Sequence, residues 1–211
     1  KLMLSFDTTD SAFSDNYKFL IGSILPRPIA VVSTKNEDGT NNVAPFSFFT
    51  GISAKPMIIA FAPLIRTSTG DKKDTVKNIE RTKEFVINFT TEDNADQVNL
   101  ASTELAYGDD EFELSGLTPI PSEVVDVMRV KQSPIHFECK LRDIISYGDQ
   151  PGAGTLITGE VVRVHVDESI YDDGRITTSK FKPMGRGAGN DWFKCDSVVE
   201  KTRLMKAQIQ K

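Results

Sequence analysis

The chain has 211 residues, of which 39% are hydrophobic and 26% charged, as in an ordinary globular protein. A formal net charge of −5 argues against nonspecific nucleic-acid binding, which requires a basic surface. The longest apolar stretches, such as Met57–Ala62, are too short to span a bilayer, so we expect neither nucleic acid nor a membrane as a partner.

The first part of the chain predicts one helix followed by strands. Apolar side chains at helical spacing stop at Pro26 and Pro28, which break a helix. The pair Asp38-Gly39 is a hairpin signal between two β-branched or apolar runs. The expected elements are a helix over residues 16–24 and strands over 29–34, 41–50 and 57–61, the last buried on both faces.

The second part alternates helices with longer strands. Val76 and Ile79 form the apolar side of a charged amphipathic segment. We expect helices over residues 71–83, 92–105 and 200–210, strands over 84–89, 135–145 and 155–166, and a loop over 107–122.

The predicted strands fall into hairpin-linked groups at both ends of the chain, with helices inserted between them. Evenly spaced strand–helix–strand units are absent from the sequence pattern. This order favours a mainly antiparallel β-barrel with α excursions over a doubly wound sheet. We expect a single domain over residues 1–211, with a core at about 17–195 and a helical tail at about 199–211.

Cysteine and histidine are scarce. Cys139 and Cys195 are too few for a disulfide framework or a Cys-based metal site, and we expect two buried, reduced thiols in a cytoplasmic protein. His136 and His165 lack ligand spacing and are expected to be ordinary strand residues, so no metal site is predicted.

Familiar catalytic motifs are also missing from the sequence. It contains no nucleotide-hydrolase phosphate loop and no Gly-x-Ser-x-Gly elbow, and Gly185-Arg-Gly187-Ala-Gly189 lacks the context of a dinucleotide fingerprint. A cofactor that carries the reaction itself would explain this poverty of catalytic side chains.

Two ordered segments resemble the flavin reductase-like family, which includes flavoredoxin. They comprise residues 27–34 with 41–49, and residues 73–79 with 84–88. The likeness continues through residues 112–117, 133–139, 159–162 and 183–186, so it covers nearly the whole chain from Tyr17 to about Phe193. The resemblance implies an FMN-binding split β-barrel, FMN rather than FAD, NAD(P)H as electron donor, and a homodimer with the flavin at the subunit interface.

The first segment has residues suited to a flavin ring. Small or rigid residues allow the backbone to approach a flat ring closely, and Pro45 is expected to interrupt strand pairing and free nearby amides. A plain edge strand with a proline-induced break is the alternative. The candidate residues are Asn42, Val43, Ala44, Pro45, Ser47 and Phe48.

The second segment has residues suited to a phosphate. Arg66 and Lys73 bring cations close to a helix N-terminus, which attracts anions. Asp74 or Thr75 is expected to be the helix N-cap, and the resemblance implies that both line the cofactor pocket together with Asn78.

Three further candidates lie outside these segments. Arg27, held between two prolines, is expected to bond the flavin edge or to stabilise the reduced anion, with a surface salt bridge as the alternative. The resemblance implies that Arg186 and Trp192 reach across from the partner subunit. Trp192 stands where the family usually has Tyr, and a core anchor is its plain alternative.

The predicted function is that of an oxidoreductase passing electrons from NAD(P)H through a bound flavin to free flavin or another small acceptor. No catalytic side chain is assigned. A flavoredoxin-like electron carrier without its own small-molecule substrate is the alternative, and a non-redox relative of the barrel is a third possibility.

Overall fold

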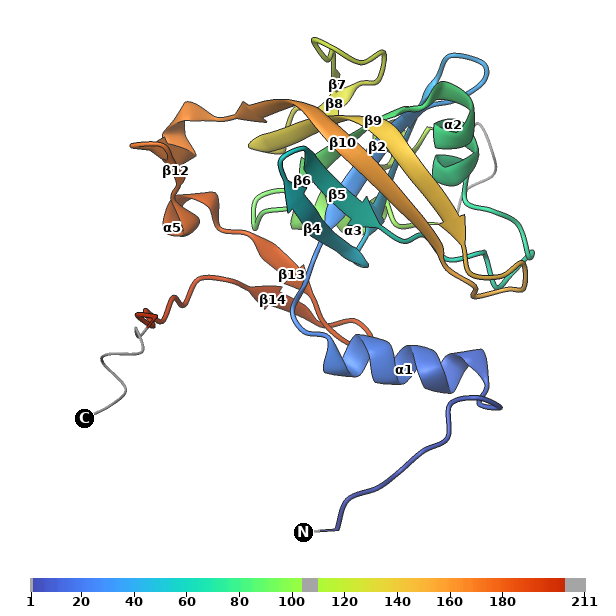
Figure 1. Ribbon diagram of the computed structural model, residues 1–211. Helices are drawn as coiled ribbons and strands as arrows, with labels where there is room; N and C mark the ends of the chain where they lie inside the picture. The colour runs from blue at the N-terminus through green and yellow to red at the C-terminus, as the bar shows by residue number, and fades with distance from the viewer. Residues whose placement is uncertain (1, 104–109, 204–211) are drawn as a thin grey trace.

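The computed structural model describes residues 2–103 and 110–203, which form one main sheet with short helices around it (Figure 1). The strands of this sheet are β2 (Ala30–Lys35), β3 (Asn41–Phe46), β4 (Phe49–Ala54), β5 (Met57–Phe61), β6 (Glu84–Phe89), β9 (Ile135–Ser146) and β10 (Thr155–Val166). All neighbours pair antiparallel, in the order β3-β2-β6-β9-β10-β5-β4. The predicted mainly antiparallel fold is confirmed.

The two outer strands of the sheet, β3 and β4, are consecutive in the chain. Only Ser47 and Phe48 separate them, and the Ala62 N–H donates to the Phe48 carbonyl at 2.8 Å. A two-residue link therefore spans the opening between the edges of a curled sheet. This is the split barrel that the resemblance implies.

Strand β2 explains how the barrel is packed on both sides. Ala30 and Val32 face a cluster inside the barrel that includes Phe85, whereas Val31 faces a second cluster outside it. A strand covered on both faces is buried along its length, and β2 is buried from Ala30 to Thr34. Strand β5 is buried over its last three residues and only half-buried at Met57 and Ile58, so its predicted double burial is confirmed in part.

Helices cover the ends and the outer cluster of the barrel. They are α1 (Phe13–Ser23), α2 (Asp74–Thr82), α3 (Ala95–Leu100), α4 (Glu111–Ser115), α5 (Thr178–Phe181) and the 3-10 turn η1 (Glu168–Ile170). Val76 and Ile79 of α2 enter the inner cluster, as their spacing predicts, and α3 and α4 pack on β3. None of the helices in the described ranges is long and apolar enough to cross a membrane.

Several predicted boundaries are wrong. The helix over residues 92–105 is confined to α3, and Leu105 lies outside the described residues. The predicted loop over 107–122 contains α4 and strand β7 (Pro119–Ile120). Residues 200–203 are not helical, and the rest of the predicted tail helix also lies outside the described residues.

Pro45 does not interrupt strand pairing. It stays in register opposite Val31, and β3 continues to Phe46. An edge strand tolerates proline because the missing N–H faces away from the sheet. The predicted strand over 41–50 does break, but two residues later, at Ser47 and Phe48.

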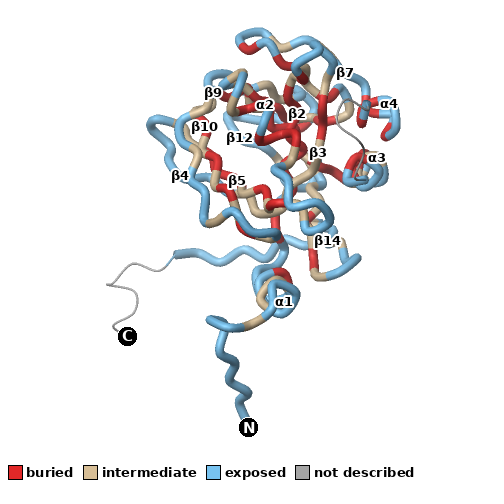
Figure 2. The backbone as a smooth tube through the Cα atoms, turned by 90° about the vertical axis from the view of Figure 1, so that its right-hand side faces the viewer, coloured by how far each residue is buried: buried red, intermediate tan, exposed pale blue. Residues whose placement is uncertain are grey.

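A small sheet joins the barrel to α1. It contains β1 (Arg27–Pro28), β13 (Met184–Arg186) and β14 (Trp192–Lys194), in the order β1-β13-β14. Figure 1 shows α1 beside this sheet, with the N-terminal segment extending farther away, and the Tyr17 ring of α1 lies 6.4 Å from the Phe48 ring. Buried residues gather in the barrel in Figure 2, and Ile21 is the buried residue of α1.

Two small hairpins complete the described fold. They are β7 with β8 (Arg129–Val130), and β11 (Tyr171–Asp172) with β12 (Arg175–Ile176).

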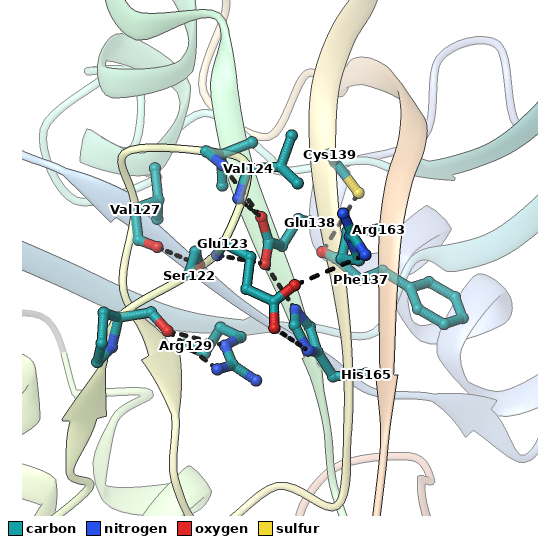
Figure 3. A network of polar contacts seen from close by, with 12 residues as sticks. Ser122, Glu123, Val124, Val127, Arg129, Phe137, Glu138, Cys139, Arg163 and His165 are labelled. Carbon is teal, nitrogen blue, oxygen red and sulfur yellow. Dashed lines mark hydrogen bonds and ion pairs between the residues drawn. The ribbon is translucent and has the colours of Figure 1, made fainter.

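A buried carboxylate holds the segment before β8 against the barrel (Figure 3). The Glu138 side chain is 0% exposed and accepts hydrogen bonds from the N–H groups of Glu123, Val124 and Val125 at 2.7–3.0 Å. His165 Nε2 lies 2.6 Å from Glu138 Oε1. Burial alone would raise the pKa of Glu138, but these hydrogen bonds outweigh it and hold the pKa below its usual value.

The two cysteines differ in environment. Cys139 belongs to the inner cluster, and burial raises the pKa of its thiol well above the usual range. Cys195 is only half-buried, so the prediction of two buried thiols is wrong for this residue. Both are free, without a disulfide.

Candidate functional site

A pocket of about 240 Å³ lies where β3, the Ser47–Phe48 link and the segment before α2 meet. We call it the main pocket. Most residues predicted for the site line it, namely Asn42, Ala44, Pro45, Ser47, Phe48, Arg66, Lys73, Asp74 and Thr75. Segments separated by about 30 residues in sequence therefore converge on one cavity, as the resemblance implies.

One part of the main pocket is apolar. Ala44, Pro45 and Phe46 of β3 contribute to it, together with Ala62 and Leu64, which follow β5. These side chains are small, rigid or flat, and they carry no polar atoms. Such a surface suits a planar aromatic ring, which gains from burial against apolar atoms.

The other part of the main pocket is charged. Arg66 donates to the Lys72 carbonyl at 2.9 Å and to Asp74 Oδ2 at 2.8 Å, which fixes the loop before α2. Lys73 lines the same pocket and is the N-cap residue of α2, so the prediction that Asp74 or Thr75 is the N-cap is wrong. Two cations at a helix N-terminus suit an anionic group such as a phosphate.

A buried polar network lies beside the main pocket and contacts residues that line it. With the oxygen and nitrogen of the Asn42 amide exchanged, the assignment that satisfies both atoms, Nδ2 donates to Glu111 Oε1 at 3.1 Å and the amide oxygen accepts from Thr75 Oγ1 at 3.2 Å. Asn78 donates to Thr34 Oγ1 at 3.0 Å and to Asn36 Oδ1 at 2.8 Å, and it is not among the residues that line the main pocket. Asn78 thus orders neighbours of the pocket, and its contact with a cofactor stays a prediction.

Val43 also lies off the main pocket. Its side chain is fully buried in the outer cluster with Val31. Successive side chains of a strand point to opposite faces, so Val43 points to the outer cluster while Asn42 and Ala44 reach the pocket. A contact between Val43 and a ligand would have to come from its backbone.

Arg27 is neither a surface ion pair nor a residue of the main pocket. The residue is 4% exposed, and its guanidinium donates to the carbonyls of Ile21, Ile24 and Gly187 at 2.8–3.1 Å and to Ser47 Oγ at 3.2 Å. No carboxylate within the described ranges forms an ion pair with it. Arg27 therefore joins α1, the loop after β13 and the Ser47–Phe48 link, so that its predicted effect on a ligand would pass through Ser47.

Replacing Arg27 by methionine is expected to lower the free energy of unfolding by about 2–4 kcal/mol, because three buried carbonyls lose a charged donor. Proteolysis should also increase within α1, whose last turn loses its link to the barrel. Urea unfolding and limited trypsin digestion measure both effects. Arg142→Met is the control, since Arg142 makes a surface ion pair with Glu160. Equal stability of the two variants would contradict the joining role.

Arg186 and Trp192 lie together on a second pocket of the same chain. The Arg186 guanidinium stacks 5.4 Å from the Trp192 ring centroid, and this pocket shares Pro45 and Ser47 with the main pocket. Trp192 also packs against the outer cluster, as expected for the alternative interpretation of this residue as a core anchor. Their contribution to a partner subunit's site stays a prediction.

Sequence reasoning missed several residues of the main pocket. Tyr17 comes from α1, Ser102 and Thr103 follow α3, and Glu111 opens α4. Asp110 and Gly116 were the available signal for α4, because an aspartate N-cap and a glycine C-cap delimit it. Nothing in the sequence pattern places these residues beside β3.

Comparison with known proteins places the chain in the flavin reductase-like family. Residues 21–180 match the model of the flavin reductase like domain. The chain is 40% identical over 182 residues to an uncharacterized protein of Halalkalibacterium halodurans, covering 85% of this chain and 87% of that protein.

Solved structures share the fold, among them the following three. Nitrilotriacetate monooxygenase component B from Bacillus cereus is 37% identical with a TM-score of 0.88, covering 97% of this chain and 100% of that one. The 2-nitrobenzoate 2-nitroreductase of Pseudomonas fluorescens is 29% identical with a TM-score of 0.86, covering 96% and 98%. The flavoredoxin of Desulfovibrio vulgaris is 25% identical with a TM-score of 0.72, covering 84% and 91%.

Proposed function

This chain belongs to the flavin reductase-like family, and we propose that it is an FMN-binding oxidoreductase that passes electrons from NAD(P)H to free flavin or another small acceptor. The observation that carries the proposal is the main pocket, which combines an apolar wall with two cations at the N-terminus of α2. An FMN has the same two parts, a flat ring and a phosphate.

Different residues of the main pocket would bind the phosphate and the ring of the flavin. Arg66 and Lys73 would hold the phosphate, with Thr75 as a hydroxyl neighbour. Ala44, Pro45 and Phe48 would face the ring and keep water from it. Ser47 Oγ accepts from Arg27 Nε, so its own hydrogen is available to a ligand acceptor.

A bound flavin would supply the two-electron chemistry, which explains why no catalytic side chain is required. The protein would supply binding and orientation. The two cations favour FMN over riboflavin because they attract the phosphate, and FMN over FAD is part of the proposal.

The test is an absorbance spectrum of the purified protein after addition of FMN and desalting, followed by anaerobic NADH and NADPH. Retained bands of oxidised flavin that bleach rapidly with either nicotinamide are the expected result. Retained bands that resist both nicotinamides would favour the flavoredoxin-like carrier instead. A protein that retains no flavin and shows no flavin-dependent oxidation of NADH or NADPH would contradict both.

A homodimer is the second part of the proposal. Apolar side chains lie exposed on and beside α1, including Phe19, Leu20 and Ile24. A further pocket, largely apolar, is lined by Ile24 and by Ile52 of β4. Contiguous exposed apolar surface commonly marks an interface between subunits. Light scattering after size exclusion is expected to give twice the chain mass. A cytoplasmic location stays a prediction.

A further inference from the structure

Glu111 is a buried carboxyl in the main pocket that the binding of a flavin phosphate does not explain. It is 9% exposed, opens α4 and lines the pocket. In the same orientation of the Asn42 amide, Glu111 Oε1 accepts from Asn42 Nδ2 at 3.1 Å, and the Asn42 oxygen accepts from the Val43 N–H at 3.3 Å. Glu111 Oε2 is buried and has no hydrogen-bond partner in the described part of the chain. A ligand is the natural source of the missing partner, because buried polar atoms are rarely left unpaired.

The charges around Glu111 do not stabilise its ionised form. Burial, with a smaller contribution from the carboxylates of Asp74 and Asp110, raises the pKa of Glu111 to about 7 against the opposing effect of backbone N–H groups. The cations of the pocket are Arg66 and Lys73, of which Arg66 is paired with Asp74. Among the elements packed against α4, β3 carries no charged residue and α3 carries only the exposed Asp96.

In its neutral form, the Glu111 carboxyl carries its proton on a defined oxygen. Because Oε1 already accepts a hydrogen bond from the Asn42 amide, the proton of the neutral form belongs on Oε2, the oxygen without a partner in the described residues. In that form Glu111 can donate to a ligand oxygen. In the ionised form it adds a negative charge to the cavity that also holds the phosphate site.

We propose that Glu111 is a binding residue of the main pocket that makes retention of a phosphate-bearing flavin depend on pH, with its neutral carboxyl donating to the ligand and its ionised carboxyl opposing the phosphate. This inference rests on the proposed flavin function. It assigns Glu111 a role in ligand selection that is separate from the phosphate contacts of Arg66 and Lys73.

The experiment compares dissociation constants for FMN and riboflavin from pH 5.5 to 8.5, measured by quenching of flavin fluorescence. FMN affinity of the wild type is expected to fall about tenfold relative to Glu111→Gln as the pH rises through 7, one unit of linked pKa shift. Dividing the dissociation constant of the wild type by that of Glu111→Gln cancels the effect of the ionisation of the FMN phosphate, which every variant shares. Riboflavin should show a much smaller change because it has no phosphate.

Glu113→Gln is the matched control, since Glu113 lies two residues away on α4 and is exposed. It should follow the wild type at every pH. Parallel FMN profiles for the wild type and Glu111→Gln would overturn the inference while leaving the proposed function intact. If the wild type binds neither flavin at any pH, the proposed function fails first and this inference fails with it.

A direct measurement tests the inference even if Glu111→Gln folds poorly. In the wild type labelled with 13C at the glutamate carboxyl, the titration of Glu111 can be followed by NMR with and without FMN. By reciprocity, a ligand that prefers the neutral carboxyl must raise its pKa, here by about one unit. A titration midpoint that FMN leaves unchanged would overturn the inference.

Discussion

Replacing Lys73 by glutamate will weaken FMN binding at least about 30-fold, whereas riboflavin binding will change about threefold or less. Lys73 lines the main pocket at the N-terminus of α2, close to Arg66. The substitution removes one cation and places an anion where the phosphate is proposed to lie. A charge-assisted hydrogen bond contributes about 1.5–3 kcal/mol, and repulsion adds to its loss.

Titration of flavin fluorescence in low-salt buffer measures both affinities. Lys72→Glu is the control, because Lys72 undergoes the same charge change one residue earlier but does not line the main pocket. That variant should lose far less affinity, since the field of an exposed charge is screened. Equal losses for FMN and riboflavin in Lys73→Glu would contradict the assignment of a phosphate site.

Replacing Glu138 by glutamine is expected to lower the free energy of unfolding by about 3 kcal/mol at pH 7. The amide oxygen of glutamine can take the place of Oε2, which accepts from Val124 and Val125. Its NH2 group would then face the Glu123 N–H, a donor against a donor. Urea unfolding followed by circular dichroism measures the loss.

The effect of Glu138→Gln should depend on pH. The pKa of Glu138 in the folded protein lies below the ordinary value of 4.5, so its contribution to stability is fully present above 4.5. The contribution is lost as the pH falls through the folded-state pKa, where the folded protein must also take up the proton. A stability difference that persists unchanged at pH 3 would argue that shape, and not charge, causes the loss.

Glu160→Gln is the control for this prediction. Glu160 lies on β10, the neighbouring strand, and makes a surface ion pair with Arg142 at 3.0 Å. Such exposed pairs contribute about 0–1 kcal/mol, so this variant should stay close to the wild type. A comparable loss in both variants would show that the Glu138 cluster has no special role.

The sequence predicts most strands of the main sheet because they have a local signal, although it joins the start of β4 to β3 and misses the short strands outside this sheet. Alternating residues locate β9 and β10, and Asp38-Gly39 locates the hairpin between β2 and β3, where Gly39 has a φ of 87°. The β-branched run over residues 29–34 predicts β2 as a strand, but not its burial on both faces. What periodicity cannot supply is the order β3-β2-β6-β9-β10-β5-β4, because pairings between distant strands leave no local pattern.

The candidate site is only partly visible in the sequence. The family resemblance brings β3 and the start of α2 together, and the main pocket contains both. The environment of Arg27 cannot be predicted from sequence patterns, because its acceptors include three backbone carbonyls, which any residue type provides. Glu111 escapes it because a five-residue helix carries too few side chains to show a period.

The link between β3 and β4 has a consequence for the order in which this chain acquires its structure. The hairpins β2–β3 and β4–β5 use neighbouring segments, but the barrel closes only when β5 pairs with β10, as Phe61 does with Ile157. Contacts between residues roughly a hundred positions apart form slowly, because long loops must close first. During synthesis, both halves of the pocket wall therefore leave the ribosome well before the strand that holds them in place. A chain that stops short of β10 would carry nearly every residue of the main pocket and still lack the barrel that shapes it.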